Sequence, residues 1–420
     1  MMLSASPTLP QSASVMDLLD KPEVWAAFLE HKRDLGHLLR RDERELIAFI
    51  DASAWQPVTD AIAADMPFPI PERRLINKLH GSKRTVYSFP DAEQQVLKLL
   101  AWLLYRFDDR QPDGCYSFRH GKSAHRALRD LLRVPDLQHR WCYKLDVSDY
   151  FNSIPERQLL EDLREVLHDD VPLYRFLTEL LTADVCMADG RRVFGSRGVM
   201  AGCPLSPFLA NIYLAPMDDA FVTRGIPYAR YSDDIIMFCD SPEQLSEAVD
   251  LVTEILDERG LSVNEDKVIF ADPGETWEFL GFAVTGDVVD LSRVTKLKLK
   301  GKIRRKARAL HRWMVRKNAT ATRAMRAMIR VFNRKFYQVD DSGHELTWAR
   351  WFFPMLTTDR SLKEIDHYLQ QELRSVASGC HRDGNFKVSY DELKELGFRS
   401  LVHEYWRYRH APAEYQSTKV

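Results

Sequence analysis

The sequence has little that would support a disulfide framework or a zinc site. Its six cysteines are scattered over 420 residues, and no two of them form a CxxC pair. Closely spaced cysteines mark both kinds of site, so their absence favours a reducing compartment and predicts a cytoplasmic protein. The sequence also lacks an apolar run near the ~20 residues of a membrane span, and its first residues lack a basic-then-apolar signal pattern. We therefore expect no membrane contact.

Acidic residues are missing from one long segment. From Arg293 to Lys335 the chain has 17 Lys or Arg residues and no Asp or Glu, whereas residues 232–290 carry 16 acidic residues and two basic ones. Outside the basic segment, 42 basic residues face 61 acidic ones, although the net charge of the whole chain is only −2. A basic block of this length is either a solvated face or a surface for an anionic partner such as nucleic acid. The charge pattern leaves both readings open.

Helical and strand-like segments alternate without a strict βαβ rhythm, which indicates an α+β fold. Three prolines between residues 66 and 71 mark a boundary. Pro155 is expected at the start of one helix and Gly260 at the end of another. The predicted strands are 141–147, 228–231, 235–239 and 277–284, and the predicted helices are 15–50, 91–106, 155–167, 243–259 and the chain from 294 onward.

Three carboxylates stand out because they end or connect apolar strands. Asp146 lies near the end of one predicted strand, and Asp233 and Asp234 form a tight turn between two others. A carboxylate beside a buried sheet is costly unless a cation compensates its charge. Two Mg²⁺ ions would do so, since Mg²⁺ prefers carboxylate and phosphate oxygens and paired ions can clamp a phosphoryl displacement. Taken alone, an Asp-Asp turn is more often an ordinary hairpin turn.

Six motifs in order make the interpretation specific. Tyr231-Ser-Asp-Asp234 resembles the active-site hairpin of reverse transcriptases, and Lys144-Leu-Asp-Val-Ser-Asp-Tyr-Phe151 resembles the motif that carries their first catalytic aspartate. Residues 198–214 are similar to the template and nucleotide motif, 260–267 to the motif that follows, 279–282 to the primer grip, and 116–128 to a fingers motif of bacterial, group II intron and retron-type enzymes. Residues 348–351, 362–366 and 390–405 are similar to the tail of bacterial defence-associated reverse transcriptases, and among these to type 2.

The resemblance implies a right-hand polymerase fold with fingers, an antiparallel palm sheet and a helical thumb. We expect an N-terminal helical extension over 1–70, fingers and palm over 71–290, a basic thumb over 291–340, and a C-terminal helical extension over 341–420. The implied activity is RNA-directed DNA polymerisation, in which two Mg²⁺ ions, or Mn²⁺ in their place, help to add dNTPs to a primer 3′-hydroxyl. The implied template is a structured non-coding RNA of a bacterial antiphage system.

Residue roles follow from the motif positions. Asp146, Asp233 and Asp234 match the catalytic carboxylates, and the backbone at Val147 is expected to join them at the metals. Phe151 matches the aromatic gate that presses against a ribose 2′-hydroxyl. The other expected nucleotide-binding residues are Lys78, Arg84, Asp149, Tyr150, Ala201, Gly202 and Lys267. The expected nucleic-acid contacts are Arg119, Tyr231, Arg304, Arg305, Arg308 and Arg312. Without the order of the motifs, most of these would pass as core or surface residues.

One departure from the family pattern concerns the template and nucleotide motif. It usually carries Pro-Gln-Gly, whereas this sequence has Met200-Ala201-Gly202 and so lacks the amide side chain. Three alternatives therefore stay open: an RNA-directed RNA polymerase, a template-independent or protein-primed DNA polymerase, and a non-enzymatic RNA-binding module of polymerase descent. Phe151 argues against the first because it would exclude a 2′-hydroxyl, and the three retained aspartates argue against the last.

Overall fold

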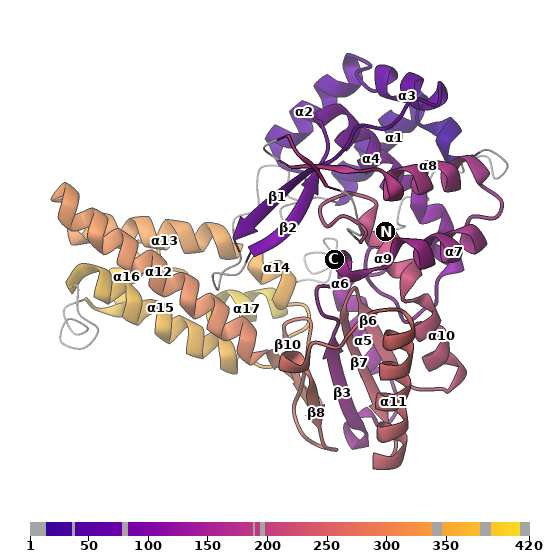
Figure 1. The fold of residues 1–420 in the computed structure, drawn as a ribbon. Coiled ribbons are helices and arrows are strands. Elements are labelled where there is room, and N and C mark those ends of the chain that lie inside the picture. Colours follow the sequence, from indigo (N-terminus) through magenta and orange to yellow (C-terminus); the bar gives the residue numbers. More distant parts are fainter. Residues whose placement is uncertain are drawn as a thin grey trace. The chain divides into compact units, whose positions relative to one another are not determined.

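The computed structural model describes residues 14–35, 38–77, 83–187, 190–193, 198–337, 347–378 and 388–411. They form two compact units (Figure 1). The first is built from the chain up to residue 34 and from 40 to 273, and the second from 35–39 and from 274 onward. Helices and mixed sheets alternate in the order expected of an α+β fold, which confirms that prediction. Among the described residues, no helix is long and apolar enough to cross a membrane.

The first unit contains two four-stranded sheets with helices around them. One sheet has the order β2-β1-β4-β5 and the other β6-β7-β3-β8. The strands are β1 (Glu72–Asn77), β2 (Lys83–Ser88), β3 (Trp141–Asp146), β4 (Val185–Met187), β5 (Arg192–Val193), β6 (Tyr228–Tyr231), β7 (Asp234–Cys239) and β8 (Ile269–Ala271). All pairings in the second sheet are antiparallel, and α11 (Pro242–Glu258) packs on β3 and β7.

The remaining helices of the first unit precede and follow these strands. They are η1 (Val15–Leu18), α1 (Pro22–Leu35), α2 (Arg40–Asp51), α3 (Gln56–Ala63), α4 (Asp91–Leu103), η2 (Leu104–Arg110), α5 (Ala124–Leu132), η3 (Leu137–His139), α6 (Tyr150–Ser153), α7 (Glu156–Val166), α8 (Val171–Thr182), α9 (Ser206–Tyr213), α10 (Ala215–Thr223) and η4 (Glu265–Lys267). Pro155 is the N-cap of α7 rather than its first residue, and Gly260 follows the end of α11 with φ +65° as expected.

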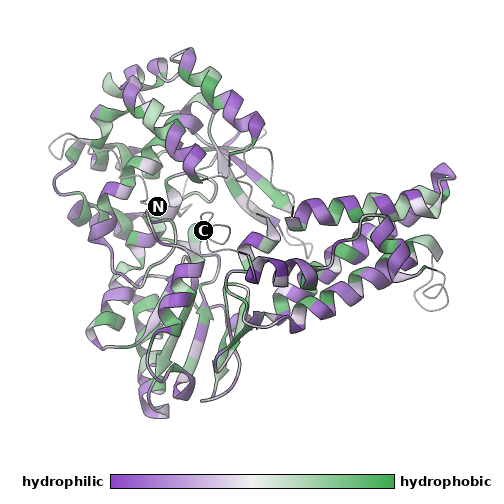
Figure 2. Cartoon of the chain, turned by 180° about the vertical axis from the view of Figure 1, so that it is seen from behind, coloured by the Kyte–Doolittle hydropathy of each residue, from purple (hydrophilic) through white to green (hydrophobic). Residues whose placement is uncertain are grey.

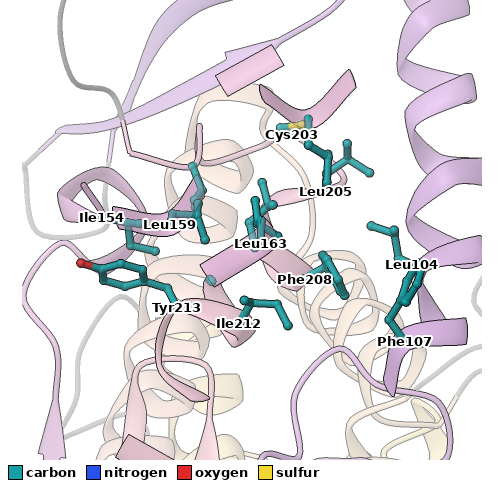
Figure 3. Packing of buried hydrophobic residues seen from close by; sticks show 14 of the residues in the cluster. Leu104, Phe107, Ile154, Leu159, Leu163, Cys203, Leu205, Phe208, Ile212 and Tyr213 are labelled. Atoms are coloured by element: carbon teal, nitrogen blue, oxygen red, sulfur yellow. The ribbon is translucent and has the colours of Figure 1, made fainter. Parts of the chain in front are cut away.

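The core of the first unit lies where helices from distant parts of the sequence meet. Leu163 of α7, Phe208 of α9 and Phe107 of η2 come together there with their neighbours (Figure 3). Each of these three residues keeps less than a tenth of its surface exposed. Burial of this apolar surface is the main force holding the helices against the sheets, and it fixes where the strand ends lie.

The second unit combines a small sheet with a helical bundle. The sheet has the order β11-β10-β9, and the bundle is centred on α12, α13 and α15, which pack on one another. The elements are β9 (Trp277–Phe279), β10 (Phe282–Thr285), β11 (Val288–Leu291), α12 (Arg293–Lys317), α13 (Ala321–Tyr337), α14 (Trp348–Phe352), α15 (Arg360–Ser378), α16 (Tyr390–Glu395) and α17 (Leu401–Arg409). The long helices mix hydrophilic and hydrophobic residues along their length (Figure 2), and α12 buries Leu299, Ile303 and Ala307.

One predicted strand differs from the structure in this region. The segment 277–284 is two strands, because Leu280 and Gly281 turn the chain with positive φ angles of +50° and +93°. This turn is bonded to the start of α12, where Thr295 Oγ1 donates to the Gly281 carbonyl at 3.0 Å. The boundary between the two compact units lies at 273/274. Later in the chain, α15 packs on α12 and α13 within the second unit.

Candidate active site

The sheet register brings the catalytic candidates together. β3 and β7 are antiparallel, and Asp146 at the end of β3 pairs directly with Asp234 at the start of β7. Asp233 lies in the turn between β6 and β7, and its carbonyl accepts a 3.2 Å hydrogen bond from the Val147 amide. Residues directly opposite in such a ladder lie only about 4.5–5.5 Å apart at Cα. Two segments nearly 90 residues apart thus present three carboxylates at one end of one sheet.

The charges of these carboxylates are met by two lysines. Lys267 Nζ lies 2.5 Å from Asp146 Oδ2, and Lys144 Nζ lies 3.1 Å from Asp234 Oδ1. The second contact is close enough for an ion pair, but it is not aligned as a hydrogen bond, since Asp234 Oδ1 has no hydrogen-bond partner. Burial raises the pKa of Asp234 to about 6 and also raises the pKa of Asp233, and the charge of Asp146 adds to both shifts. The site is therefore short of positive charge.

The carboxylates suit a hard divalent cation. Their oxygens are the ligands that Mg²⁺ prefers, and the buried Asp234 Oδ1 has an ion-pair contact with Lys144 but no hydrogen bond. Within the described ranges, no three or more His, Cys, Asp or Glu side chains form a metal-binding group, and Asp146 and Asp234 each contact a lysine. Asp146, Asp233 and Asp234 are the residues that fit the ion.

A buried ion pair between Arg230 and Asp218 is connected to the catalytic hairpin. Arg230 and Asp218 are both completely buried, and Arg230 Nε donates to both Asp218 oxygens at 3.0 and 2.9 Å. Arg230 also reaches the Ser232 carbonyl at 3.4 Å, which links the pair to the turn before Asp233. Removing one partner of such a pair typically costs about 3–5 kcal/mol. We did not predict this pair, although an arginine at an inward position of an apolar strand is a signal that a buried acid must face it.

The turn at Met200-Ala201-Gly202 is hydrogen-bonded to β2. The Ala201 carbonyl accepts a 2.8 Å hydrogen bond from the Tyr87 amide, and the Ala201 side chain is buried. Gly202 has φ +106°, and a Cβ there would lie 2.8 Å from the Tyr87 carbonyl, so only glycine allows the close approach. Met200 is also left-handed, with φ +58°. The backbone of the turn keeps an ordered shape without the amide of the usual motif.

Comparison with known proteins agrees with this geometry. Residues 76–284 match the family described as reverse transcriptase (RNA-dependent DNA polymerase), and the match spans β3, the hairpin and the turn at 200–202. Residues 76–284 belong to the reverse transcriptase family. The fold expected from the motifs, a right-hand polymerase, is confirmed by this membership, and the family generally uses divalent metals.

Individual relatives are distant. The chain is 22% identical to the retron Ec86 reverse transcriptase of Escherichia coli over 237 residues, which cover 56% of this chain and 66% of that protein. It is 30% identical to an uncharacterized 91 kDa protein in the cob intron of Schizosaccharomyces pombe over 153 residues, 36% of this chain and 18% of that protein. Telomerase from Candida tropicalis with a fragment of telomeric RNA aligns with a TM-score of 0.43 and 13% identity, covering 87% of this chain and 67% of that one.

Several predicted residues of the reverse transcriptase domain lie around the carboxylates. Asp149 is exposed with φ +41° and caps α6. Phe151 is partly buried, and its carbonyl lies against Gly198, where a Cβ would clash. Tyr231 is partly exposed on β6 and pairs in register with Asp234. These placements bring the nucleotide candidates next to the catalytic ones.

Other predicted residues have structural roles. Tyr150 is buried, and its hydroxyl donates to the Ala210 carbonyl, so its side chain packs in the core instead of facing a nucleotide. Arg119 is buried and donates to backbone carbonyls, including Asp108 at 2.7 Å and Cys115 at 3.1 Å. Its guanidinium holds a loop together, whereas we expected a nucleic-acid contact. Lys78 lies outside the described residues, and of Arg84 only the backbone, on β2, is described.

The basic block forms α12 and α13 in the second unit. Ile303 and Ala307 of α12 are buried, whereas Leu310 and Met314 on the same helix are only partly buried. The four arginines predicted to contact nucleic acid are all exposed: Arg304, Arg305, Arg308 and Arg312. Among the described residues, none of these four arginines forms an ion pair with an acid. Their charges therefore remain available to an anionic partner.

Proposed function

We propose that this chain is an RNA-directed DNA polymerase whose reaction centre is the carboxylate group of Asp146, Asp233 and Asp234. The observation that carries the proposal is the register of β3 and β7, which sets Asp146 opposite Asp234 within a reverse transcriptase domain. Oxygens of these three residues would hold divalent cations, which when bound supply charge neutralisation at the α-phosphate of the incoming nucleotide. A primer 3′-hydroxyl attacks that phosphorus and pyrophosphate leaves.

The remaining residues of the site orient the reactants. The ammonium of Lys267 at Asp146 is exposed and mobile enough to pair with phosphate oxygens once the carboxylate is neutralised. Phe151 lies at the start of α6 beside the strand end, where it would limit the space at the ribose 2′ position. The ordered backbone at 200–202 would support the base pair being formed.

The defining experiment removes the hairpin carboxylates without changing their shape. The Asp233→Asn, Asp234→Asn double variant should reduce dNTP incorporation on an RNA template–primer to background. RNA binding should persist, and the melting temperature should stay equal or rise because two carboxylates with raised pKa are gone. Asp240→Asn, an exposed aspartate at the far end of β7, is the matched control and should keep full activity. Wild-type rates in the double variant would refute the carboxylate mechanism.

We further propose that the template is a structured non-coding RNA and that the activity serves bacterial antiphage defence. Support comes from the similarity of the C-terminal segments to defence-associated enzymes and from the relationship to a retron reverse transcriptase. RNA and DNA purified with the chain should include one enriched RNA and DNA complementary to it. Recovery of untemplated DNA would favour the template-independent alternative that Ala201 keeps open.

A further inference from the structure

One exposed aromatic residue near the site is held in an unusual conformation. Phe118 is 43% exposed and has φ +56°. A bulky residue in the left-handed region is a genuine outlier that costs free energy, and exposure of the ring forgoes its burial. The arrangement persists only if the surrounding structure imposes it.

Both neighbours of Phe118 are buried and bonded. The Ser117 hydroxyl accepts a 2.8 Å hydrogen bond from the Ser232 amide in the catalytic hairpin, and Asn211 Nδ2 donates to the Ser117 carbonyl at 2.8 Å. On the other side, the Arg119 guanidinium binds the carbonyls of its own loop. Hydrogen bonds thus hold the chain on either side of Phe118, and we call them clamps. On one side, a bonding partner is the hairpin that carries Asp233 and Asp234.

The clamps place the ring beside the reacting centre. The Phe118 ring centroid lies 6.1 Å from that of Tyr231, with an interplanar angle of 44°. Tyr231 is the register partner of Asp234 and stands two residues before Asp233. Two aromatic rings from separate segments therefore lie next to the carboxylates, and Phe118 offers no charge or hydrogen bond to a ligand.

We infer that Phe118 is a positioning residue whose ring, beside Tyr231 of the hairpin, stacks on the nucleobase at the 3′ end of the primer. The inference rests on the proposed function. A stacking surface suits this task because every base has a π face, so stacking holds any terminal nucleotide without reading its identity. The primer end is the occupant, because its 3′-hydroxyl must reach the carboxylates that adjoin these rings.

The left-handed backbone supplies a variant that separates this role from a structural one. Glycine adopts φ +56° without strain, so Phe118→Gly should fold with an equal or higher melting temperature. It should nevertheless raise the KM for primer by about tenfold, the loss expected for one base–aromatic stack. Phe118→Trp should restore most of the wild-type KM. Tyr390→Ala, which alters an aromatic of similar exposure (41%) in the second unit, should leave it unchanged.

Primers that end in an abasic nucleotide identify the stacked partner. The wild-type chain should lose about tenfold in KM when the terminal base is missing, whereas Phe118→Gly should lose little more, because the stack is already absent. Equal abasic penalties in both proteins, or a penalty that depends only on an abasic template position, would overturn the inference while the polymerase remained. Failure of the wild-type chain to extend any primer would instead overturn the proposed function and the inference with it.

Discussion

Phe151, which we propose as the sugar gate, is held in place by packing. Its ring is partly buried against the core and lies 5.8 Å from the ring of Tyr150, edge to face. Its backbone is fixed as well, since the Phe151 carbonyl accepts a 2.8 Å hydrogen bond from Val199. Movement of the ring would disturb its contact with Tyr150, so we expect the ring to resist displacement by a larger sugar.

Shortening this side chain should therefore relax sugar selection. We predict that Phe151→Ala raises the ratio of kcat/KM for ribonucleotides to that for deoxyribonucleotides by about 10–100-fold, since relief of a steric clash is worth about 1–3 kcal/mol. Single-nucleotide incorporation kinetics with both sugars measure the ratio. Phe270→Ala, at a more exposed ring on β8, is the control and should not change it. An unchanged ratio in Phe151→Ala would mean that Phe151 serves the core alone.

His31 provides a pH-dependent contribution to stability. It lies on α1, stacked on Trp102 at 5.4 Å, and burial lowers the pKa of His31 to about 4. A lowered folded-state pKa means that the neutral ring is preferred, so its contribution is fully present above pH 6.5 and is lost as pH falls toward 4.

Replacing His31 should flatten that dependence. We predict that His31→Phe, which keeps an aromatic ring against Trp102, loses about 1–3 kcal/mol less stability than the wild type between pH 7 and pH 4. Urea unfolding at a series of pH values measures the difference, and it cancels the titration of carboxylates common to both proteins. Parallel stability curves would show that His31 titrates normally in the folded chain.

The helix α12 presents its arginines without acids to balance them. Lys296 and Lys300 near its start do pair with Glu364 of α15, at 3.1 and 2.6 Å. The exposed arginines that follow occur in a segment with no acidic residue, so mutual repulsion favours an anionic partner. The helix α12 therefore carries two lysines that pair with Glu364 and a group of exposed arginines for which the described residues show no acidic partner.

That contrast gives a controlled test of nucleic-acid binding. We predict that changing Arg305, Arg308 and Arg312 together to Gln weakens RNA binding and reduces the log–log salt slope by about two to three units. Changing Lys296 and Lys300 to Gln should alter the slope less, because both already pair with Glu364, whose single charge offsets one of theirs. The rate at saturating template should recover in the arginine variant. Equal affinity and slope in the arginine variant and the wild type would show that α12 is only a solvated face.

The whole molecule holds two separate compact units, each with a buried core. Leu163 is fully buried in the first and Leu373 of α15 in the second. Unfolding of multi-unit chains commonly departs from a single two-state transition.

We predict two transitions in urea, each sensitive to its own core. Leu163→Ala should shift one transition by about 2–5 kcal/mol, and Leu373→Ala should shift the other by a similar amount. Circular dichroism follows both, and tryptophan fluorescence reports on each unit. A single transition that moves equally with either substitution would show that the two units unfold together.

The local sequence was sufficient to predict those elements whose formation depends on interactions between neighbouring residues. The apolar pattern at 141–147 predicted β3, and the helical pattern at 243–259 with Gly260 after it predicted α11, both to within one or two residues. The carboxylates could also be placed at strand ends, because the apolar runs beside them are unambiguous. Family resemblance then supplied the chemistry for those positions.

Long-range contacts decided the rest. The sequence could not reveal that Arg119 turns inward to bind carbonyls, that Arg230 buries its charge against Asp218, or that Lys144 meets Asp234, because each depends on segments brought together by folding. The strain at Phe118 arises in the same way, from bonds to residues as distant as Ser232. Strand and helix propensity act within a few residues, whereas the partner of a charged or strained group is set by the packing of the whole unit.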